Sequence, residues 1–242
     1  MTSQDGPDRG TRGAGGMEAL YPFLYAGPAD IPGVLEQVRA STVAKIAEIA
    51  ELRRAVGARD AERLARCAAG AAARFAAGGR LFAFGNGGSA TDAQQLATLF
   101  LNPGDGAPPL PAFGLASDTS VVTALCNDIG VDVVFARQLA AFGTRKDIAV
   151  GLSTSGNSDN LLRAFEEASR RGMLTIGLAG YDGGKMAELD SLDYLCVAPS
   201  ASVHRIQEAQ TTIYHVLWEL TVDAVAGPAA AGPARAGPGA TP

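Results

Sequence analysis

Apolar and polar residues along the chain form two kinds of segment. Short apolar runs, typical of buried strands, cover 80–84, 112–116, 148–152, 174–179 and 194–197. Apolar residues at helical spacing lie between and after these runs, at 90–101, 120–127, 132–142, 160–171 and 203–224, with a short turn near 185–189. Strands that alternate with helices in this way predict a doubly wound α/β fold, with a parallel five-stranded sheet covered by helices on both faces.

Two helices are predicted before this alternation begins. Apolar residues recur at near-helical spacing over 34–56, and an alanine-rich helix follows over 60–77. Gly78 and Gly79 supply the glycines that commonly end a helix. The sheet domain is therefore expected to carry an N-terminal helical extension.

The two ends of the chain lack such periodicity. Residues 1–16 and 227–242 are rich in glycine or proline and are predicted to be disordered tails. A single domain is expected over 17–226, and Met17 is a second candidate for the natural start. Residues 18–32 hold three aromatic side chains beside prolines, which indicates an extended arm that packs on another surface, such as a neighbouring subunit.

The first candidate site is the turn Gly85-Asn86-Gly87-Gly88-Ser89, which ends an apolar run and enters a helix. Backbone N–H groups at a helix N-terminus hold phosphate well, and glycines let the backbone approach it. Asn86 and Ser89 add side-chain donors. The turn fits neither the GxGxxG nor the P-loop spacing, so a plain tight connection is the competing interpretation.

A second loop of the same construction follows the run at 148–152. It reads Ser153-Thr154-Ser155-Gly156-Asn157-Ser158, and Ser158 is placed to cap the helix that begins at Asp159. Ligands of open parallel sheets bind outside the carboxyl ends of the strands, so both loops are expected to face one crevice. Several hydroxyls exceed what a helix cap requires, and this favours an anion site over an ordinary junction.

Composition excludes some classes of function. The formal charge is 20 − 25 = −5 with no long basic run, which argues against nucleic-acid binding. No apolar stretch approaches the ~18 residues that span a membrane, and the N-terminus lacks the apolar core of a signal peptide, so a cytoplasmic protein is expected. Cys67, Cys126 and Cys196 are odd in number and widely spaced, as expected of reduced thiols.

Five motifs together resemble the sugar isomerase (SIS) domain family, and within it the phosphoheptose isomerases. They are Gly85-Asn-Gly-Gly-Ser89, Thr123-Ala-Leu-Cys-Asn127-Asp128, Gly151-Leu-Ser-Thr-Ser-Gly-Asn-Ser158, Gly180-Tyr-Asp-Gly-Gly-Lys185 and Arg205-Ile-Gln-Glu208. The resemblance runs over about 34–224. It implies a flavodoxin-like sheet and an enzyme that converts sedoheptulose 7-phosphate into heptose 7-phosphate.

The resemblance also implies roles for individual residues. The phosphate would be held by Ser153, Thr154, Ser155 and Ser158. The sugar would be contacted by Asn86, Gly87, Gly88, Ser89, Asn127, Asp128 and Gln207. His215 matches a histidine that transfers protons and binds zinc in the family. Such proteins are tetramers with sites between subunits, so a homotetramer that binds a sugar phosphate is expected.

Two positions depart from the family pattern. The enzymes carry a histidine and, four residues later, a glutamate, on one face of the helix after the first loop. Gln95 and Leu99 stand there in this chain. The glutamate is the enediol-forming base and a metal ligand, and leucine can serve as neither. Gln207 and His215 alone remain of the ligand set, and zinc favours four ligands, so no tightly bound zinc is expected.

Three functions stay open at this point. The first is an aldose–ketose isomerase with His215 as acid or base and Glu208 as an unusual partner. For Glu208 a salt bridge is the competing interpretation, and His204 is expected to face solvent although it lies close enough to reach a ligand. The second function is a phosphosugar-binding regulator or scaffold without catalysis, which would need a protein partner. The third is a different reaction, such as epimerisation, on a related sugar phosphate.

Overall fold

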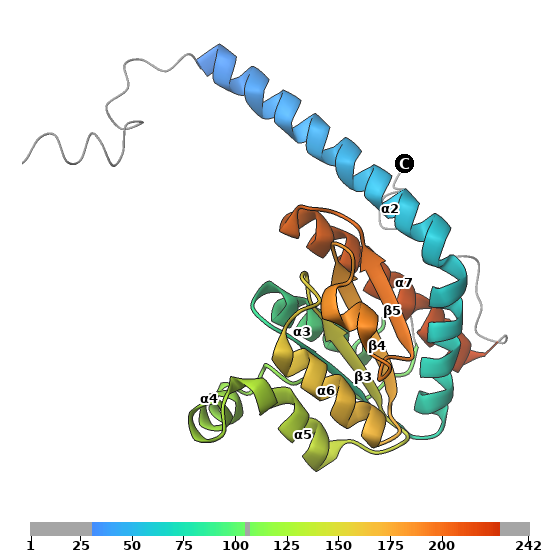
Figure 1. Cartoon of the computed structure of the whole chain (residues 1–242). Coiled ribbons are helices and arrows are strands. Elements are labelled where there is room, and N and C mark those ends of the chain that lie inside the picture. The colour runs from blue at the N-terminus through green and yellow to red at the C-terminus, as the bar shows by residue number, and fades with distance from the viewer. Residues whose placement is uncertain (1–30, 105–106, 228–242) are drawn as a thin grey trace, which may run out of the picture. The chain divides into compact units, whose positions relative to one another are not determined.

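The computed structural model describes residues 31–104 and 107–227 of the chain (Figure 1). The predicted tail at 1–16 and the aromatic arm at 18–32 lie outside the described residues, except for Ile31 and Pro32. The predicted tail at 227–242 lies outside them as well, except for Gly227.

One five-stranded sheet forms the centre of the fold. Its strands are β1 (Leu81–Gly85), β2 (Ala112–Gly114), β3 (Ile148–Leu152), β4 (Leu174–Gly180) and β5 (Tyr194–Ala198). All neighbours pair in parallel, in the order β2-β1-β3-β4-β5. This is the flavodoxin-like order, and it confirms the predicted fold class. After β1 the chain adds β2 on one side of β1, and β3 then pairs with the opposite side of β1. Ligands of such sheets bind where the strand order reverses in this way, which is between β1 and β3.

Helices connect the strands (Figure 1). They are α2 (Ile31–Ala76), α3 (Gly88–Leu101), α4 (Thr119–Asp128), α5 (Val134–Phe142), α6 (Asp159–Arg170) and α7 (Val203–Ala226), with two 3₁₀ turns, η2 (Val131–Val133) and η3 (Gly184–Glu188). The predicted elements after residue 80 are all present, with ends that differ by one or a few residues. Such differences are common at fraying helix ends.

The prediction of two separate N-terminal helices is wrong, because α2 is continuous from Ile31 to Ala76. Gly57 lies at the expected break. A Cβ at Gly57 would meet no atom within 4 Å, so the residue marks no turn or close approach. A single helical glycine costs about 1 kcal/mol, and packing of the buried neighbours Val56 and Asp60 outweighs this cost.

Two apolar layers enclose the sheet, because side chains of a strand alternate between its faces. Leu81 and Ala83 of β1 pack into the layer that holds residues 56–75 of α2 together with parts of α3 and α7. Phe82 and Phe84 of the same strand pack on the other side with α5 and α6. Both faces are therefore covered, as the uninterrupted apolar strands predict.

A buried carboxylate fixes the start of β3 relative to β1. Asp147 is 1% exposed, and its Oδ2 accepts from Arg80 Nη2 at 3.1 Å and from the Thr144 backbone N–H at 2.8 Å. Its Oδ1 accepts from the Arg80 backbone N–H at 2.8 Å. Burial by itself raises the pKa of Asp147, but these bonds from Arg80 and Thr144 lower the pKa below its ordinary value.

The chain divides into two units, residues 1–47 and 48–242. The described part of the first unit is the beginning of α2. Its large apolar side chains each expose half or more of their surface: Ile31, Val34, Leu35, Val38, Val43 and Ile46.

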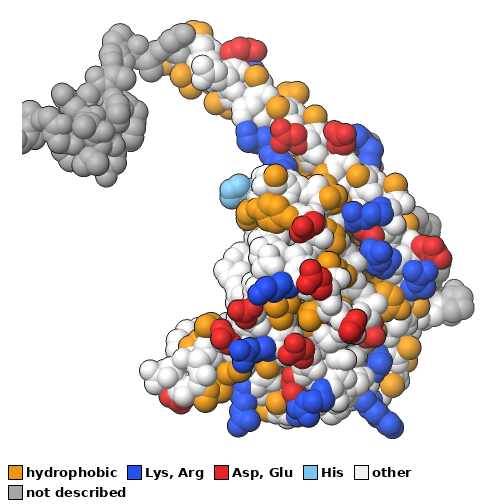
Figure 2. Space-filling model, viewed as in Figure 1, with side chains coloured by type: hydrophobic (Ala, Val, Ile, Leu, Met, Phe, Trp, Pro, Cys, Tyr) orange, Lys and Arg blue, Asp and Glu red, His pale blue; other side chains and the backbone are white. Residues whose placement is uncertain are grey.

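Neither sign of charge dominates the face of the described residues that Figure 2 shows. On the face shown in Figure 2, side chains of both signs are interspersed over the described residues. Among the helices of residues 31–104 and 107–227, none combines the length and the apolarity that crossing a membrane requires.

Candidate functional site

The two predicted loops lie side by side at the carboxyl edge of the sheet. β1 and β3 pair in register up to Gly85 and Leu152, so the loops that follow them start from adjacent positions. The side-chain amides of Asn86 and Asn160 join the loops by two reciprocal hydrogen bonds, each of 2.9 Å. Asn160 lies in the first turn of α6 and is 6% exposed. The two loops therefore meet at one edge of the sheet, as expected, and a ligand crevice between them stays a prediction.

The loop after β3 is shaped by its own hydroxyl groups. Ser153 is buried, and its Oγ accepts from the Gly156 N–H at 3.0 Å. Ser155 Oγ accepts from the Asn157 N–H at 3.2 Å, while Thr154 is half-buried. Ser158 occupies the N-cap position of α6, but its side chain makes no capping hydrogen bond, so the predicted cap is wrong. A nest of N–H groups at a helix start, together with these hydroxyls, is suited to an anion.

The loop after β4 packs against residues 153–158, which are called the phosphate loop here after their predicted role. Gly156 has φ +67°, and a Cβ there would collide with the carbonyl of Gly183. The Met186 N–H donates to the Gly156 carbonyl at 3.0 Å. The Lys185 N–H donates to Oδ1 of Asn157 at 2.9 Å. The glycines of the motif at 180–185 thus allow two backbones to touch, which fixes the shape of the phosphate loop.

Helix α7 reaches both loops. A Cβ on Gly88 would collide with the side-chain amide of Gln207, so this amide lies against the start of α3. The fully buried Gln210 donates from Nε2 to the Ser153 carbonyl at 3.2 Å. Its Oε1 is buried with no hydrogen-bond partner among the described residues. Gln210 thereby ties the first residue of the phosphate loop to the helix that carries Gln207 and His215.

His215 is half-buried and held in one orientation. Its Nδ1 lies 2.8 Å from the Thr211 carbonyl, and its ring stacks on Tyr214 with centroids 4.9 Å apart. A carbonyl oxygen only accepts hydrogen bonds, so Nδ1 carries the proton in this contact. In the neutral imidazole Nε2 is then the unprotonated nitrogen.

Helix α3 presents one face with Asp92, Gln95 and Leu99, which are spaced three and four residues apart. Leu99 is half-buried and packs against the apolar core, whereas Gln95 is exposed. Asp92 is half-buried beside Tyr214. Burial raises the pKa of the Asp92 carboxyl, against the opposing effect of a hydrogen bond from the Tyr214 hydroxyl.

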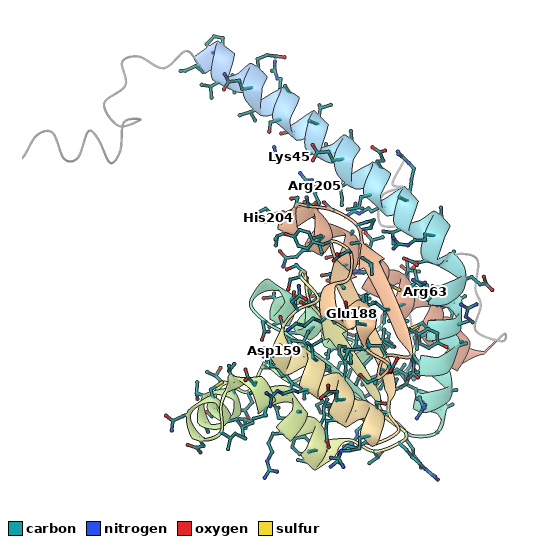
Figure 3. The ribbon with its side chains drawn as sticks, viewed as in Figure 1. Lys45, Arg63, Asp159, Glu188, His204 and Arg205 are labelled. Atoms are coloured by element: carbon teal, nitrogen blue, oxygen red, sulfur yellow. The ribbon has the colours of Figure 1, made fainter. Side chains whose placement is uncertain are left out.

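Glu208 takes part in an ion pair at the start of α7. Its Oε2 accepts from Arg205 Nη1 at 2.6 Å, and Arg205 also donates to Glu48 at 3.2 Å. His204 is exposed at the same helix start, next to Arg205 (Figure 3).

Asn127 and Asp128 lie at the end of α4, where both are exposed and bonded to each other at 2.9 Å. Among the described residues no hydrogen bond links either of them to the two loops. Ser89, in contrast, is buried in the first turn of α3.

Three polar residues of this region are absent from the sequence-based prediction. Asn160 and Gln210 form hydrogen bonds with the loops, but the sequence around them gives no sign of this. An amide side chain in a predicted helix is normally expected at the surface. Asp92 could have been found, because it precedes Gln95 by three residues on the helix face that carries the departures from the family pattern.

The residues at the positions of the zinc site that the family resemblance implies offer few donor atoms. Leu99 offers no donor atom, and Gln95 offers only an amide. Within residues 31–104 and 107–227, no three His, Cys, Asp or Glu side chains are grouped closely enough to hold a metal ion. Gln207 and His215 alone fall short of the four ligands that zinc favours.

The fold and the paired loops define a class of protein. The sequence profile of the SIS domain family matches residues 46–180, more than half of the chain. The chain belongs to the SIS domain family.

Several proteins to which the chain is similar are phosphoheptose isomerases, as the motifs predict. The enzyme from Desulfovibrio desulfuricans is 46% identical over 173 residues, which cover 71% of this chain and 81% of the relative. The solved phosphoheptose isomerase from Neisseria gonorrhoeae is 35% identical with a TM-score of 0.70, and the match covers 75% of this chain and 97% of that one. The Francisella tularensis structure is 30% identical with the same TM-score, over 78% and 97% of the two chains.

Proposed function

We propose that this protein is an aldose–ketose isomerase that acts on sedoheptulose 7-phosphate or a related sugar phosphate. The observation that carries the proposal is the link through Gln210 between the phosphate loop and the helix of His215. This link holds an anion-binding loop and a titratable imidazole in one rigid framework. The names of the relatives, all phosphoheptose isomerases among those reported above, support the same activity.

The phosphate is proposed to bind at Ser153, Thr154, Ser155 and Ser158. The Ser158 hydroxyl makes no capping bond, and the N–H groups at the start of α6 are near it. Asn86, Gly87, Gly88, Ser89 and Gln207 are proposed to contact the sugar, because the Gln207 amide lies against the glycines of the first loop. Asn127 and Asp128 are assigned to the sugar by the resemblance alone.

Isomerisation moves a proton between C1 and C2 of the sugar through an enediol. His215 is proposed to carry this proton on Nε2, since Nδ1 is committed to the Thr211 carbonyl. In the neutral tautomer with Nδ1 protonated, Nε2 is the basic nitrogen that general base catalysis requires.

A carboxylate is proposed to act with His215 in place of the missing glutamate. Glu208 is one candidate, but Arg205 holds its Oε2 at 2.6 Å. Asp92 is the stronger candidate, because it shares a helix face with Leu99 and because burial raises its pKa toward the operating range of a base.

The reaction is proposed to proceed without tightly bound zinc, on the strength of the donor set alone. A homotetramer is proposed as well, supported by the exposed apolar side chains at residues 31–46 and by the family resemblance. A cytoplasmic location stays a prediction.

Proton exchange in deuterated water tests the activity directly. The full-length protein is incubated with sedoheptulose 7-phosphate after treatment with a chelator, and NMR follows the carbons next to the carbonyl. We expect deuterium to enter at these carbons while the aldose phosphate accumulates. Added zinc is expected to leave the rate unchanged.

The two histidines of the chain provide a matched pair of variants. His215→Asn should lower kcat by about 100-fold to 10,000-fold and leave binding of sedoheptulose 7-phosphate intact. His204→Asn is the control, since His204 is exposed at the start of α7. Asp92→Asn and Glu208→Gln identify the carboxylate, because only the substitution of the active one should lower kcat.

A lack of exchange would contradict the proposal if sedoheptulose 7-phosphate still raises the melting temperature. The protein would then be a phosphosugar-binding regulator or scaffold. Deuterium entry without accumulation of the aldose phosphate would indicate a different reaction at the same carbon, such as epimerisation.

A further inference from the structure

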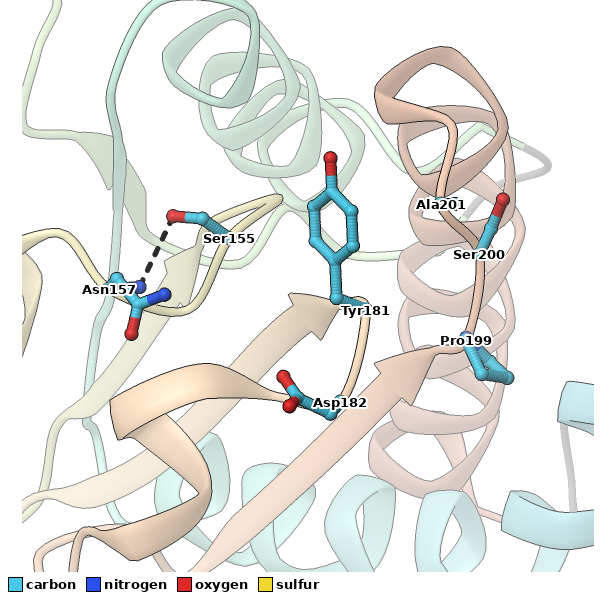
Figure 4. A pocket seen from close by; sticks show the side chains of 7 residues that line it. All are labelled: Ser155, Asn157, Tyr181, Asp182, Pro199, Ser200 and Ala201. Carbon is cyan, nitrogen blue, oxygen red and sulfur yellow. Dashed lines mark hydrogen bonds between the residues drawn. The ribbon is translucent and has the colours of Figure 1, made fainter.

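A pocket of about 700 Å³ opens beside the phosphate loop (Figure 4). It lies over the carboxyl ends of β3, β4 and β5, whereas β1 and the glycine turn are not part of it. Its lining comes from three loops: Ser155, Asn157, Tyr181, Asp182, Pro199, Ser200 and Ala201. This volume is within the usual range of small-molecule sites. The candidate sugar residues on α3 and at Gln207 and His215 do not line it.

Tyr181 has an unusual backbone for its residue type. Its φ is +52°, and it is the one residue other than glycine with a positive φ among residues 31–104 and 107–227. A side chain in this conformation costs roughly 1–2 kcal/mol, and such strain is concentrated at ligand sites. The ring stands upright between Ser155 and Ser200 and is 40% exposed (Figure 4). A residue with a strained backbone thus presents an aromatic face to solvent.

Hydrogen-bonding groups surround that face. Asp182 Oδ1 accepts from the Gly184 N–H at 3.0 Å, which fixes the carboxylate, and no described residue donates to Oδ2. Ser200 Oγ accepts from the Ser202 N–H at 3.1 Å, so its own proton is available for donation. An acceptor on one side and a hydroxyl donor on the other suit groups that both donate and accept.

The charge of the lining excludes a second phosphate site. Asp182 is the only charged side chain among the seven lining residues, and it would repel an anion. Lys185 lies in the same loop, but its Nζ pairs with Asp159 at 3.3 Å instead. A neutral ligand with an apolar ring face could stack on the Tyr181 ring, and its hydroxyl groups could form hydrogen bonds with the carboxylate and the serine hydroxyls of the lining.

We propose that this pocket binds a neutral sugar ring, stacked on Tyr181 and hydrogen-bonded to Asp182 and Ser200. The proposal does not depend on the isomerase reaction, although the pocket adjoins the loop that is proposed to bind the phosphate. Contacts connect it to the phosphate loop, since Ser155 belongs to both and a Cβ on Gly184 would collide with the Ser155 carbonyl. Occupation of the pocket therefore limits the freedom of the phosphate loop.

Ligand-observed saturation-transfer NMR on the full-length protein tests this proposal. The probes are the methyl glycosides of glucose, mannose and galactose, each measured with saturating inorganic phosphate to occupy the phosphate loop. We expect transfer to the ring C–H protons of at least one probe. Tyr181→Phe should retain the transfer, and Asp182→Asn should weaken the apparent Kd by about tenfold.

Tyr181→Gly is the decisive variant, because glycine adopts the positive φ without strain. It should abolish the transfer while the melting temperature stays within a few degrees of the native value, because relief of the strain offsets the lost contacts of the ring. Loss of binding then cannot be ascribed to unfolding. The proposal is overturned if the native protein shows no transfer with any of the three probes. Transfer that survives in Tyr181→Gly, or that disappears when phosphate is added, would overturn it too.

Discussion

The phosphate loop keeps the residues that the family pattern predicts, whereas the α3 face with Gln95 and Leu99 does not. Hydroxyl, backbone and glycine contacts fix the phosphate loop from three sides, through Ser153, Gly156 and Gln210. On α3, the positions of the expected histidine and glutamate hold Gln95 and Leu99, and Leu99 belongs to the apolar core. In the proposed function, anchoring of the substrate and proton transfer to it therefore depend on separate elements, and we expect that one can change while the other is kept.

The sharpest test of this difference restores the missing groups. Gln95→His with Leu99→Glu should create a four-ligand set with Gln207 and His215, bind one zinc ion per chain and raise kcat about 100-fold to 10,000-fold. Metal analysis after dialysis and the exchange assay measure the two effects. Without zinc the buried glutamate should cost about 1–3 kcal/mol of stability.

Leu99→Gln with Gln95→His is the control, since it supplies polarity without a carboxylate. If the first double variant neither retains zinc nor gains rate, Gln207 and His215 are not positioned as a metal site.

The converse change damages the phosphate loop. Gly156→Ala places a Cβ at φ +67° against the Gly183 carbonyl, which forces the loop to move. We expect binding of sedoheptulose 7-phosphate to weaken about 100-fold or more, as isothermal titration would measure. Gly87→Ala has a similar φ of +55° but meets no atom within 4 Å. Because Gly87 is proposed to contact the sugar, the two variants are compared by binding of inorganic phosphate, for which the loss in Gly87→Ala should be much smaller. Equal losses would mean that backbone strain alone, and not the contact with Gly183, shapes the loop.

The next prediction concerns Asp147, which fixes the start of β3 relative to β1 and so supports the two strands that carry the loops. Asp147→Asn should lower the free energy of unfolding by about 2–3 kcal/mol at pH 7, because it leaves the partly exposed Arg80 without its buried partner. The pKa of Asp147 is lowered on folding, so its contribution is present above the unfolded pKa of about 3.9 and is lost as pH falls through the folded pKa.

Denaturant titrations at several pH values measure this prediction. The difference between the native protein and Asp147→Asn should shrink below about pH 4. Glu62→Gln is the control, since its exposed pair with Arg66 is expected to contribute no more than about 0.5 kcal/mol. A difference that stays constant down to low pH would assign the loss to packing.

The smallest effect concerns the connection between the two regions. Gln210→Leu keeps the volume but leaves the Ser153 carbonyl without its donor, so KM for sedoheptulose 7-phosphate should rise about fivefold to thirtyfold while kcat changes little. Gln210→Glu tests the donor itself, since a carboxylate cannot donate to the carbonyl and should raise KM further. A fall in kcat with KM unchanged would place Gln210 on the side of proton transfer.

The sequence predicts the sheet well because β1, β3 and β4 are apolar runs buried at every position, and β5 is an apolar run that is partly buried. The single helix α2 is missed for a physical reason: Gly57 is a local weakness, and the packing of Val56 and Asp60 that overrides it is set by residues far along the chain. The predicted capping bond of Ser158 is absent for a similar reason. The local sequence places Ser158 at the N-cap position, but it does not determine where the hydroxyl points.

For the site, the sequence predicts the two loops and their common edge. It does not predict the residues that join them. Asn160 meets Asn86 across 74 positions and Gln210 meets Ser153 across 57, and such pairs depend on the packing of whole helices. The surroundings of the two candidate carboxylates are also not predictable from the motifs: Glu208 is paired with Arg205, whereas Asp92 lies beside Tyr214.

The reciprocal bonds between Asn86 and Asn160 form a closed ring of two donors and two acceptors. A sugar group that enters between these amides must replace both a donor and an acceptor to leave neither amide unsatisfied. A hydroxyl can do this, whereas an ether oxygen only accepts and an ammonium only donates. For the sugar contact proposed at Asn86, we therefore expect ligands with a free hydroxyl at this position to bind more tightly than their alkylated or aminated analogues.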